Sequence, residues 1–257
     1  MLQNDWCPPL IGHDPKGEIK RLVEEYKHLF PTSLPKQHAK VDPVKFRVKE
    51  GVNLPHAAKP RPLSRHKREA VDAIIDKLLK EGIIKPSTSQ YASPIVLAAK
   101  KGRQGINRWR LCVDYRLWNN VFENDPYPVM NLHNLLEETG GGQLFATLDL
   151  KAAYHQMPLD PETSEQLAFC THSGLYQWTR MPFGPKGAPS SFIRMADNIF
   201  HHDFIKKYFD DLAVFAKDYE DIIKKLRILF DLCTKHRLVF EGSKCHLAVQ
   251  KNLLFRT

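Results

Sequence analysis

Tyr208-Phe209-Asp210-Asp211 places two adjacent carboxylates between two segments, residues 203–207 and 212–216, whose apolar and aromatic residues suit β-strands. Two such segments joined by a short acidic stretch predict a hairpin whose turn presents the carboxylates. Asp149 lies upstream, at the end of residues 144–149, a run of apolar, β-branched and aromatic residues that predicts another strand. We therefore expect the carboxylate at the end of that strand to meet the acidic pair at a neighbouring turn.

Asp149, Asp210 and Asp211 are the candidate catalytic residues and metal ligands. Mg²⁺ prefers oxygen ligands and usually takes one or two protein carboxylates together with substrate phosphates. Three aspartates can share two ions roughly 3.5–4 Å apart, one activating an attacking 3′-hydroxyl and the other holding a triphosphate and its leaving group. An isolated Asp-Asp pair is more often a solvated turn, so the assignment depends on the motifs that accompany it.

The accompanying motifs form a series of blocks along the chain. They are Lys-Pro-Arg-Pro-Leu-Ser (59–64), Glu-Gly-Ile-Ile-Lys-Pro-Ser-Thr-Ser (81–89), Ala-Ser-Pro-Ile-Val-Leu (92–97), Arg-Trp-Arg-Leu-Cys-Val-Asp-Tyr-Arg (108–116), Leu-Asp-Leu-Lys-Ala-Ala-Tyr-His-Gln (148–156), Met-Pro-Phe-Gly (181–184), Ala-Pro-Ser-Ser-Phe (188–192), the Tyr-x-Asp-Asp turn and Ser-Lys-Cys (243–245). In this order the blocks resemble the reverse transcriptases of Ty3/gypsy-type LTR retrotransposons, in the fingers and palm region of a Pol polyprotein. A host RNA-directed RNA polymerase or a group II intron-type protein fits the same blocks poorly.

The resemblance implies an α+β fold, the right-hand polymerase fingers and palm, in which helices back an antiparallel palm sheet and most of the thumb is missing. The expected domains are an N-terminal linker with a short helix over residues 1–58, fingers over 59–125 and 157–187, palm over 126–156 and 188–250, and the truncated start of the primer-grip and thumb region over 251–257.

Local patterns place the first helix and sheet within this outline. An apolar stripe predicts a helix over residues 65–81, with Ser64 as its cap and Gly82 as its stop. We expect this helix to pack on two strands, residues 95–99 and 109–113.

Further helices are expected towards both ends of the chain. Residues 189–202 and 219–236 carry helical apolar stripes, and a proline at position 189 suits a first turn. A short amphipathic helix is expected over residues 19–29, ended by Pro31, whereas residues 1–17 have no periodicity and suggest a tail or linker.

Two cations are candidate nucleotide ligands. Arg110 matches the family's Trp-Arg motif, for which the resemblance implies contact with nucleotide phosphates, and a planar guanidinium suits bidentate phosphate contact. Without the resemblance, Arg110 would be an ordinary surface arginine on a strand. Lys101 is the second candidate, because it lies in the glycine-containing basic loop 100–105, which in the family closes over the incoming nucleotide.

The resemblance also assigns aromatic and glycine residues to the substrate. It places Tyr154 beneath the sugar, where a ribose 2′-hydroxyl would clash, and Phe183 with Gly184 along the nucleotide pocket. Tyr208 and Phe209 are expected to face the template and primer. From the residues alone, Tyr154 would be a packed tyrosine and Pro-Phe-Gly an ordinary turn.

The charge and composition agree with a nucleic-acid partner. The formal net charge is +9, and basic residues gather within 100–116, which suits a phosphate backbone. The implied partners are an RNA or DNA template with its primer, deoxynucleotides, and two Mg²⁺ ions, with Mn²⁺ as the alternative. Five cysteines without a C-x-x-C pair, no bilayer-length apolar run and no signal peptide indicate no disulfides, no membrane partner and an intracellular place, a cytoplasmic retrotransposon particle or the nucleus.

Departures from the family pattern keep two functions open. Phe209 is bulkier than the usual aliphatic residue, and Lys206 and Lys207 lie on a palm strand where buried lysines need partners. Residues 252–257 replace the primer-gripping stretch, so we expect thumb, connection, RNase H and integrase to be missing. The first function is an RNA-directed DNA polymerase domain. The alternative is a decayed or repurposed element fragment that binds nucleic acid without polymerising.

Overall fold

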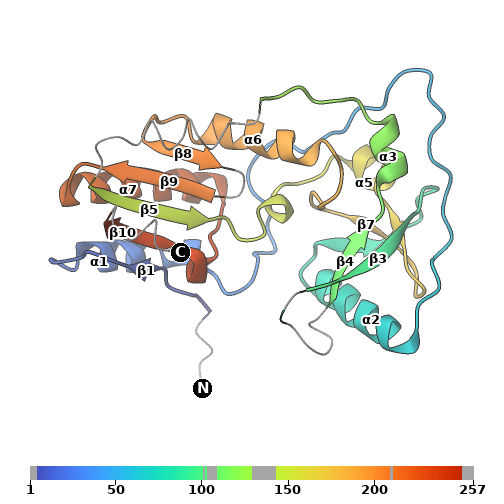
Figure 1. Ribbon diagram of the computed structural model, residues 1–257, viewed down its shortest axis with the longest axis horizontal. Helices are drawn as coiled ribbons and strands as arrows, with labels where there is room; N and C mark the ends of the chain where they lie inside the picture. The colour runs from blue at the N-terminus through green and yellow to red at the C-terminus, as the bar shows by residue number, and fades with distance from the viewer. Residues whose placement is uncertain (1–4, 101, 103–108, 129–142, 209–210, 251–257) are drawn as a thin grey trace. The chain divides into compact units, whose positions relative to one another are not determined.

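The computed structural model describes residues 5–100, 102, 109–128, 143–208 and 211–250. These residues form two five-stranded sheets. The sheets belong to two compact units, each built from separate stretches of sequence (Figure 1). Unit 1 comprises Met1–Val41, Tyr127–Gln156 and Phe192–Thr257, and unit 2 comprises Asp42–Pro126 and Met157–Ser191. A segment between residues 42 and 126 and another between 157 and 191 are thus inserted into unit 1 along the sequence.

The sheet of unit 1 has the strand order β1-β10-β5-β9-β8. Its strands are β1 (Leu10–Ile11), β10 (His246–Gln250), β5 (Leu144–Asp149), β9 (Asp211–Ala216) and β8 (Ile205–Tyr208). Neighbouring strands are antiparallel, except that β1 runs parallel to β10. The three strands predicted around the aspartates are confirmed, and they lie side by side in the sheet.

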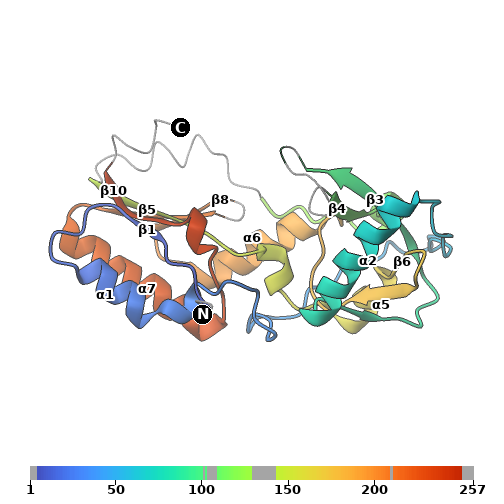
Figure 2. The same ribbon diagram turned by 90° about the horizontal axis from the view of Figure 1, so that it is seen from below.

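Helices cover one face of this sheet. Helix α7 (Tyr219–His236) packs on β5 and β9, and α1 (Glu18–Glu25) packs on α7 (Figure 2). The bounds of α7 are those that the apolar stripe predicted, and the Asp218 side chain caps the helix by accepting a hydrogen bond from the Asp221 amide.

An aromatic cluster joins the N-terminal segment to the core of unit 1. The Phe30 ring lies 5.7 Å from the Phe230 ring of α7 and 5.6 Å from the Phe240 ring, measured between centroids. All three side chains are fully buried, and burying a phenylalanine stabilises a fold by about 1.5–3 kcal/mol. Leu29, the last residue of the short 3-10 helix Lys27–Leu29 that precedes Phe30, is buried in the same core.

Unit 2 has its own sheet, with the strand order β2-β7-β6-β3-β4. Its strands are β2 (Ile84–Pro86), β7 (Leu175–Trp178), β6 (Phe169–Cys170), β3 (Ser93–Ala99) and β4 (Trp109–Val113). Its helices are α2 (Arg65–Lys80), α3 (Arg116–Val121) and α5 (Pro161–Gln166). The two predicted strands are confirmed as β3 and β4, which pair with each other, and α2 packs on β4, as expected, and on β2.

The end of α2 explains why the helix stops where the sequence predicted. Gly82 adopts a left-handed conformation with φ of +66°, its amide bonds to the Leu79 carbonyl, and the Ile83 amide bonds to the Leu78 carbonyl. This pair of hydrogen bonds is a Schellman motif, for which glycine is the preferred residue. At the other end the expected cap is wrong in detail: Ser64 occupies the cap position, but its side chain accepts no capping hydrogen bond.

Three boundaries differ from those expected. Residues 1–17 are not simply a tail, because Leu10 and Ile11 form β1 and pair with β10. The helix expected over residues 19–29 divides into α1 and a 3-10 turn. Helix α6 (Ala188–Ile199) ends before residue 202, because the chain turns there, and the Ile205 amide bonds to the His202 carbonyl at the start of β8.

The five cysteines are all free in this structure. Cys170, Cys233 and Cys245 are buried and pack as small apolar side chains. None of the helices in the described part of the chain combines the length and apolarity needed to cross a membrane.

Candidate active site

Asp149 and Asp211 lie directly opposite each other across two paired strands. Asp149 is the last residue of β5 and Asp211 the first of β9, and the antiparallel register pairs the two residues. Directly opposed residues of an antiparallel pair have α-carbons about 4.5–5.5 Å apart. Tyr208, the last residue of β8, pairs with Asp211 from the other side, whereas Phe209 and Asp210 lie outside the described residues. Two of the three predicted carboxylates therefore meet at one end of the sheet.

The surroundings of Asp211 change the pKa of its carboxyl group. The pKa of Asp211 is raised, first because its carboxyl group is partly desolvated and then because Asp149 carries a like charge. Desolvation is the largest cause even though the residue as a whole remains exposed. Two such carboxylates favour a cation between them, because a positive charge removes their repulsion.

Lys244, for which the sequence predicted no role, lies beside this pair of carboxylates. Lys244, in the 3-10 turn Gly242–Lys244, places its Nζ 3.0 Å from Asp149 Oδ2. The ion pair with Asp149 raises the pKa of Lys244, and the positive charge of Lys244 offsets part of the rise in the pKa of Asp211. The sequence block Ser243-Lys244-Cys245 marked this position, but its contact with a residue 95 positions away could not be read from the sequence.

The donor set fits a hard divalent cation. Asp149 and Asp211 offer carboxylate oxygens from adjacent strands, the ligand type that Mg²⁺ and Mn²⁺ take. Among the residues that the structure describes, no group of three or more His, Cys, Asp or Glu side chains is arranged to hold a metal. The third predicted ligand, Asp210, is not among them. The metal assignment of the triad therefore stays a prediction.

The sequence suggested that Lys206 and Lys207 on β8 would destabilise the sheet unless they had partners, and Lys207 has two. Lys207 Nζ lies 2.6 Å from Asp197 Oδ1 of α6 and donates a hydrogen bond to the Phe200 carbonyl at 3.0 Å. A half-buried lysine with an acidic partner and a carbonyl acceptor is compatible with this edge strand of the sheet. This departure from the family pattern is thus accommodated by α6.

Tyr154 follows Asp149 in the 3-10 turn Ala153–Gln156 of unit 1. Its ring is half-buried and lies 5.7 Å from the Phe192 ring, between centroids. The packing agrees with the ordinary interpretation of the tyrosine, and its predicted role beneath a sugar stays a prediction.

The other predicted nucleotide ligands lie in unit 2. Arg110 is an exposed residue of β4, paired with Ala98 of β3, and Phe183 has 53% of its surface exposed. Gly184 has φ of +113°, and a Cβ atom there would lie 3.2 Å from Tyr115 Cδ2, so this turn requires glycine. Lys101 lies outside the described residues.

Asp114 binds two arginines in unit 2. Arg116 donates to both of its carboxylate oxygens, at 2.8 and 2.7 Å, and Arg61 Nη2 lies 2.6 Å from Oδ2. The hydrogen bonds from Arg116, and then from Arg61, hold the pKa of Asp114 well below its usual range. Asp114 and Arg116 therefore form an ion pair within unit 2.

Comparison with known proteins relates this arrangement to one class of enzyme. The family described as reverse transcriptase (RNA-dependent DNA polymerase) matches residues 98–255. The chain is 33% identical to the retrovirus-related Pol polyprotein from transposon opus of Drosophila melanogaster over 246 residues, covering 93% of the chain and 24% of the relative. It is 35% identical to that from transposon 412 of the same organism over 184 residues, covering 69% and 15%. The chain thus spans about a quarter or less of the length of these relatives.

The fold is also that of a solved structure. The foamy viral protease-reverse transcriptase in complex with an RNA/DNA hybrid superimposes with a TM-score of 0.79 at 21% identity, covering 91% of the chain and 32% of that protein. The similarity confirms the expected α+β fold.

Proposed function

The chain belongs to the reverse transcriptase (RNA-dependent DNA polymerase) family, and on that basis we propose that it adds deoxynucleotides to a primer 3′ end by two-metal nucleotidyl transfer. It is a reverse transcriptase domain homologous to retrotransposon Pol polyproteins. Unit 1 would be the palm and unit 2 the fingers of that polymerase.

One observation carries the proposal: Asp149 and Asp211 meet at the end of the β5–β9 pair. Chain segments more than 60 residues apart in sequence bring two carboxylates together, at a cost visible in the raised pKa of Asp211. Carboxylates whose pKa is raised by desolvation and by a like charge cluster at functional sites. Asp210, next to Asp211 in the sequence, would complete the triad.

Phosphoryl transfer leaves little covalent work to the protein, so positioning and charge neutralisation dominate. Mg²⁺ bound at the aspartates would supply the Lewis acid that activates the 3′-hydroxyl and neutralises the triphosphate. Asp149 and Asp211 would hold the metal ion. Lys244 places a positive charge beside the Asp149 carboxylate. Arg110 would contact the nucleotide phosphates, Tyr154 the sugar, and Phe183 with Gly184 the wall of the nucleotide pocket.

The proposed partners are deoxynucleotides and a primer bound to an RNA or DNA template. The foamy viral relative is described in complex with an RNA/DNA hybrid, and the net charge of +9 suits binding to a phosphate backbone. Tyr208 and Phe209 are the residues proposed to lie near the primer end.

The alternative is a fragment that binds nucleic acid without polymerising. Phe209, bulkier than the residue usual in the family, favours this alternative, but it lies outside the described residues. The acidic partner of Lys207 removes one of the sequence objections to an active palm.

Primer extension on an RNA template with Mg²⁺ and deoxynucleotides tests the proposal. Asp149→Asn and the double variant Asp210→Asn, Asp211→Asn should each lower extension by more than about 100-fold, because several kcal/mol of charge stabilisation would be lost. Asp203→Asn is the matched control, since Asp203 is an exposed aspartate in the loop before β8 of the same unit. Extension at the wild-type rate by both variants would refute the proposal. A folded wild type that binds primer-template but never extends it would establish the alternative.

A further inference from the structure

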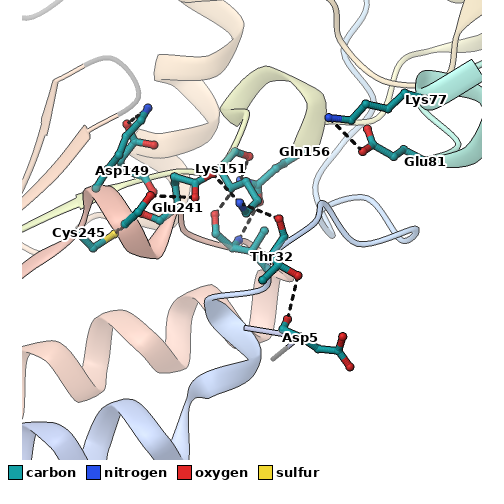
Figure 3. Close-up of polar contacts among 12 residues, drawn as sticks. Asp5, Thr32, Lys77, Glu81, Asp149, Lys151, Gln156, Glu241 and Cys245 are labelled. Carbon is teal, nitrogen blue, oxygen red and sulfur yellow. Dashed lines mark hydrogen bonds and ion pairs between the residues drawn. The ribbon is translucent and has the colours of Figure 1, made fainter. Parts of the chain in front are cut away.

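Lys151 is a buried lysine two residues after Asp149. Only 8% of its surface is exposed, although lysine is rarely buried unless it is paired. Its Nζ lies 2.5 Å from Glu241 Oε2 and 3.4 Å from the Thr32 carbonyl oxygen (Figure 3). Three separate segments of unit 1 therefore converge on one ammonium group.

The segments that carry Lys151 and Glu241 are also joined through their backbones. The Glu241 amide donates to the Asp149 carbonyl at 2.9 Å, and the Lys151 amide donates to the Val239 carbonyl at 3.0 Å. The Cys245 thiol lies 3.3 Å from the Glu241 carbonyl. The Lys151–Glu241 ion pair thus adds a side-chain contact to this ladder of two backbone hydrogen bonds, one of which is accepted by the Asp149 carbonyl.

Gln156 fixes the turn that follows. Its Nε2 donates to the carbonyls of Lys151 and Val239 at 2.8 and 2.9 Å, and its Oε1 accepts from the Val239 amide at 2.8 Å. Between these contacts, Ala152 adopts a left-handed conformation with φ of +44°, which non-glycine residues rarely take. Such strain persists only where surrounding contacts hold the backbone in place.

We propose that Lys151 is a positioning residue: with Glu241, it holds the end of β5 so that the Asp149 carboxylate stays opposite Asp211. This inference depends on the proposed function, in which the two aspartates bind the metal. A buried ion pair is a weak source of stability, because desolvating two charges offsets most of their attraction, but it can fix one arrangement of the chain. Groups that orient metal ligands from behind matter nearly as much as the ligands.

The Thr32 contact extends the proposal to the N-terminal segment. Residues before 98 lie outside the matched family region, yet the Thr32 carbonyl completes the polar surroundings of Lys151. The Ala39 amide also donates to the Gln156 carbonyl, at 2.7 Å. The segment around residues 32–39 therefore supports the same turn from the other side.

The test replaces Lys151 with an apolar residue of similar length and measures metal binding and local exchange on the full chain. Lys151→Met should weaken Mn²⁺ binding about tenfold, measured by titration calorimetry or electron paramagnetic resonance. Hydrogen exchange should accelerate at the Lys151 and Glu241 amides, whose hydrogen bonds form the ladder. Lys151→Arg, which keeps the charge, should stay closer to wild type.

Lys225→Met is the matched control. Lys225 is a half-buried lysine of the same unit, 2.9 Å from Asp221 Oδ2 and 2.8 Å from the Phe215 carbonyl, at the end of β9 away from Asp211. It should lower the melting temperature without changing Mn²⁺ affinity. Glu241→Gln added to Lys151→Met should cause little further loss, because the two residues act through each other.

The outcomes separate this proposal from the proposed function. Asp211→Asn should weaken Mn²⁺ binding and leave exchange at Lys151 unchanged; if Mn²⁺ binding is instead unaltered, the metal site is refuted, and the exchange data still decide the role of Lys151. The role is overturned if Lys151→Met leaves both exchange and affinity within twofold of wild type, or if Lys225→Met produces the same two changes.

Discussion

Asp211 is a residue whose position costs stability. Desolvation and the charge of Asp149 both raise its pKa above the value in the unfolded chain, so ionising Asp211 costs more free energy in the folded state. That cost is fully present above the folded pKa and disappears as the pH falls below about 4, the usual pKa of aspartate. Functional sites commonly keep such costs, because removing them would remove the chemistry.

Asp211→Asn should therefore stabilise the protein at neutral pH. We expect a rise in melting temperature on the order of 1–2 °C, small because Asp211 is exposed and water screens its charge. The rise should shrink as the pH is lowered towards 4, where wild-type Asp211 also becomes neutral. Thermal melts of both proteins between pH 4 and 8 measure the difference. A variant that is less stable than wild type at pH 7 would contradict the assigned direction of the pKa.

The sequence allowed the aspartates to be predicted but not the residues that surround them. Asp149 could be found because it ends a short run with strand character, and Asp211 because it follows a turn signal. Lys244 and Lys151 contact Asp149 and Glu241 across about 90 residues of chain, and no periodicity reports such a contact. Their chemistry depends on which strands pair, which the sequence pattern leaves open.

Elements with strong local signals were predicted well, and those defined by a distant partner were not. Helix α7 carries a capping aspartate and a continuous apolar stripe, so its bounds follow from local rules. Strand β1 has two residues and no pattern, and it exists because β10, more than 230 residues later, offers a free edge. The N-terminal segment therefore looked like a linker until its partner was known.

The fit of that segment onto unit 1 depends on Gly242. A Cβ atom at Gly242 would lie 1.8 Å from the Cys7 carbonyl oxygen, which is backbone and cannot rotate away. Gly242→Ala should displace residues 7–12 and destabilise the fold by roughly 1–3 kcal/mol, the usual range for overpacking. Limited proteolysis should then cut the N-terminal segment faster, and denaturant unfolding gives the free energy.

Gly17→Ala provides the comparison. Gly17 adopts a left-handed conformation, with φ of +65°, but a Cβ there meets nothing within 4 Å. Its replacement should cost about 1–2 kcal/mol through backbone strain alone and leave the segment protected from protease. If Gly242→Ala also leaves the segment protected, close packing against Cys7 does not hold it in place.

At the scale of the whole molecule, the positive net charge is the property that suits the protein to a negatively charged nucleic acid. Many cations are engaged within the fold, as in the pairs Arg227–Glu25, Lys45–Glu162 and Lys225–Asp221. The excess of +9 remains after all acidic residues are counted. Binding to a template-primer should therefore rest on phosphate contacts, which carry no sequence information.

The final prediction follows from that excess. Each neutralised phosphate releases counterions, so the affinity for a primer-template should fall steeply with salt, by about a hundredfold between 50 and 200 mM if four phosphates are contacted. Lys100→Ala, at the exposed end of the β3–β4 hairpin, should weaken binding equally for unrelated template sequences and reduce the salt slope by about 1. Lys224→Ala on the exposed face of α7 is the control and should leave the slope unchanged. Fluorescence anisotropy at four salt concentrations measures all three proteins. Tight binding that does not depend on salt would mean that base or apolar contacts dominate, and the basic cluster over 100–116 would then have no role in holding nucleic acid.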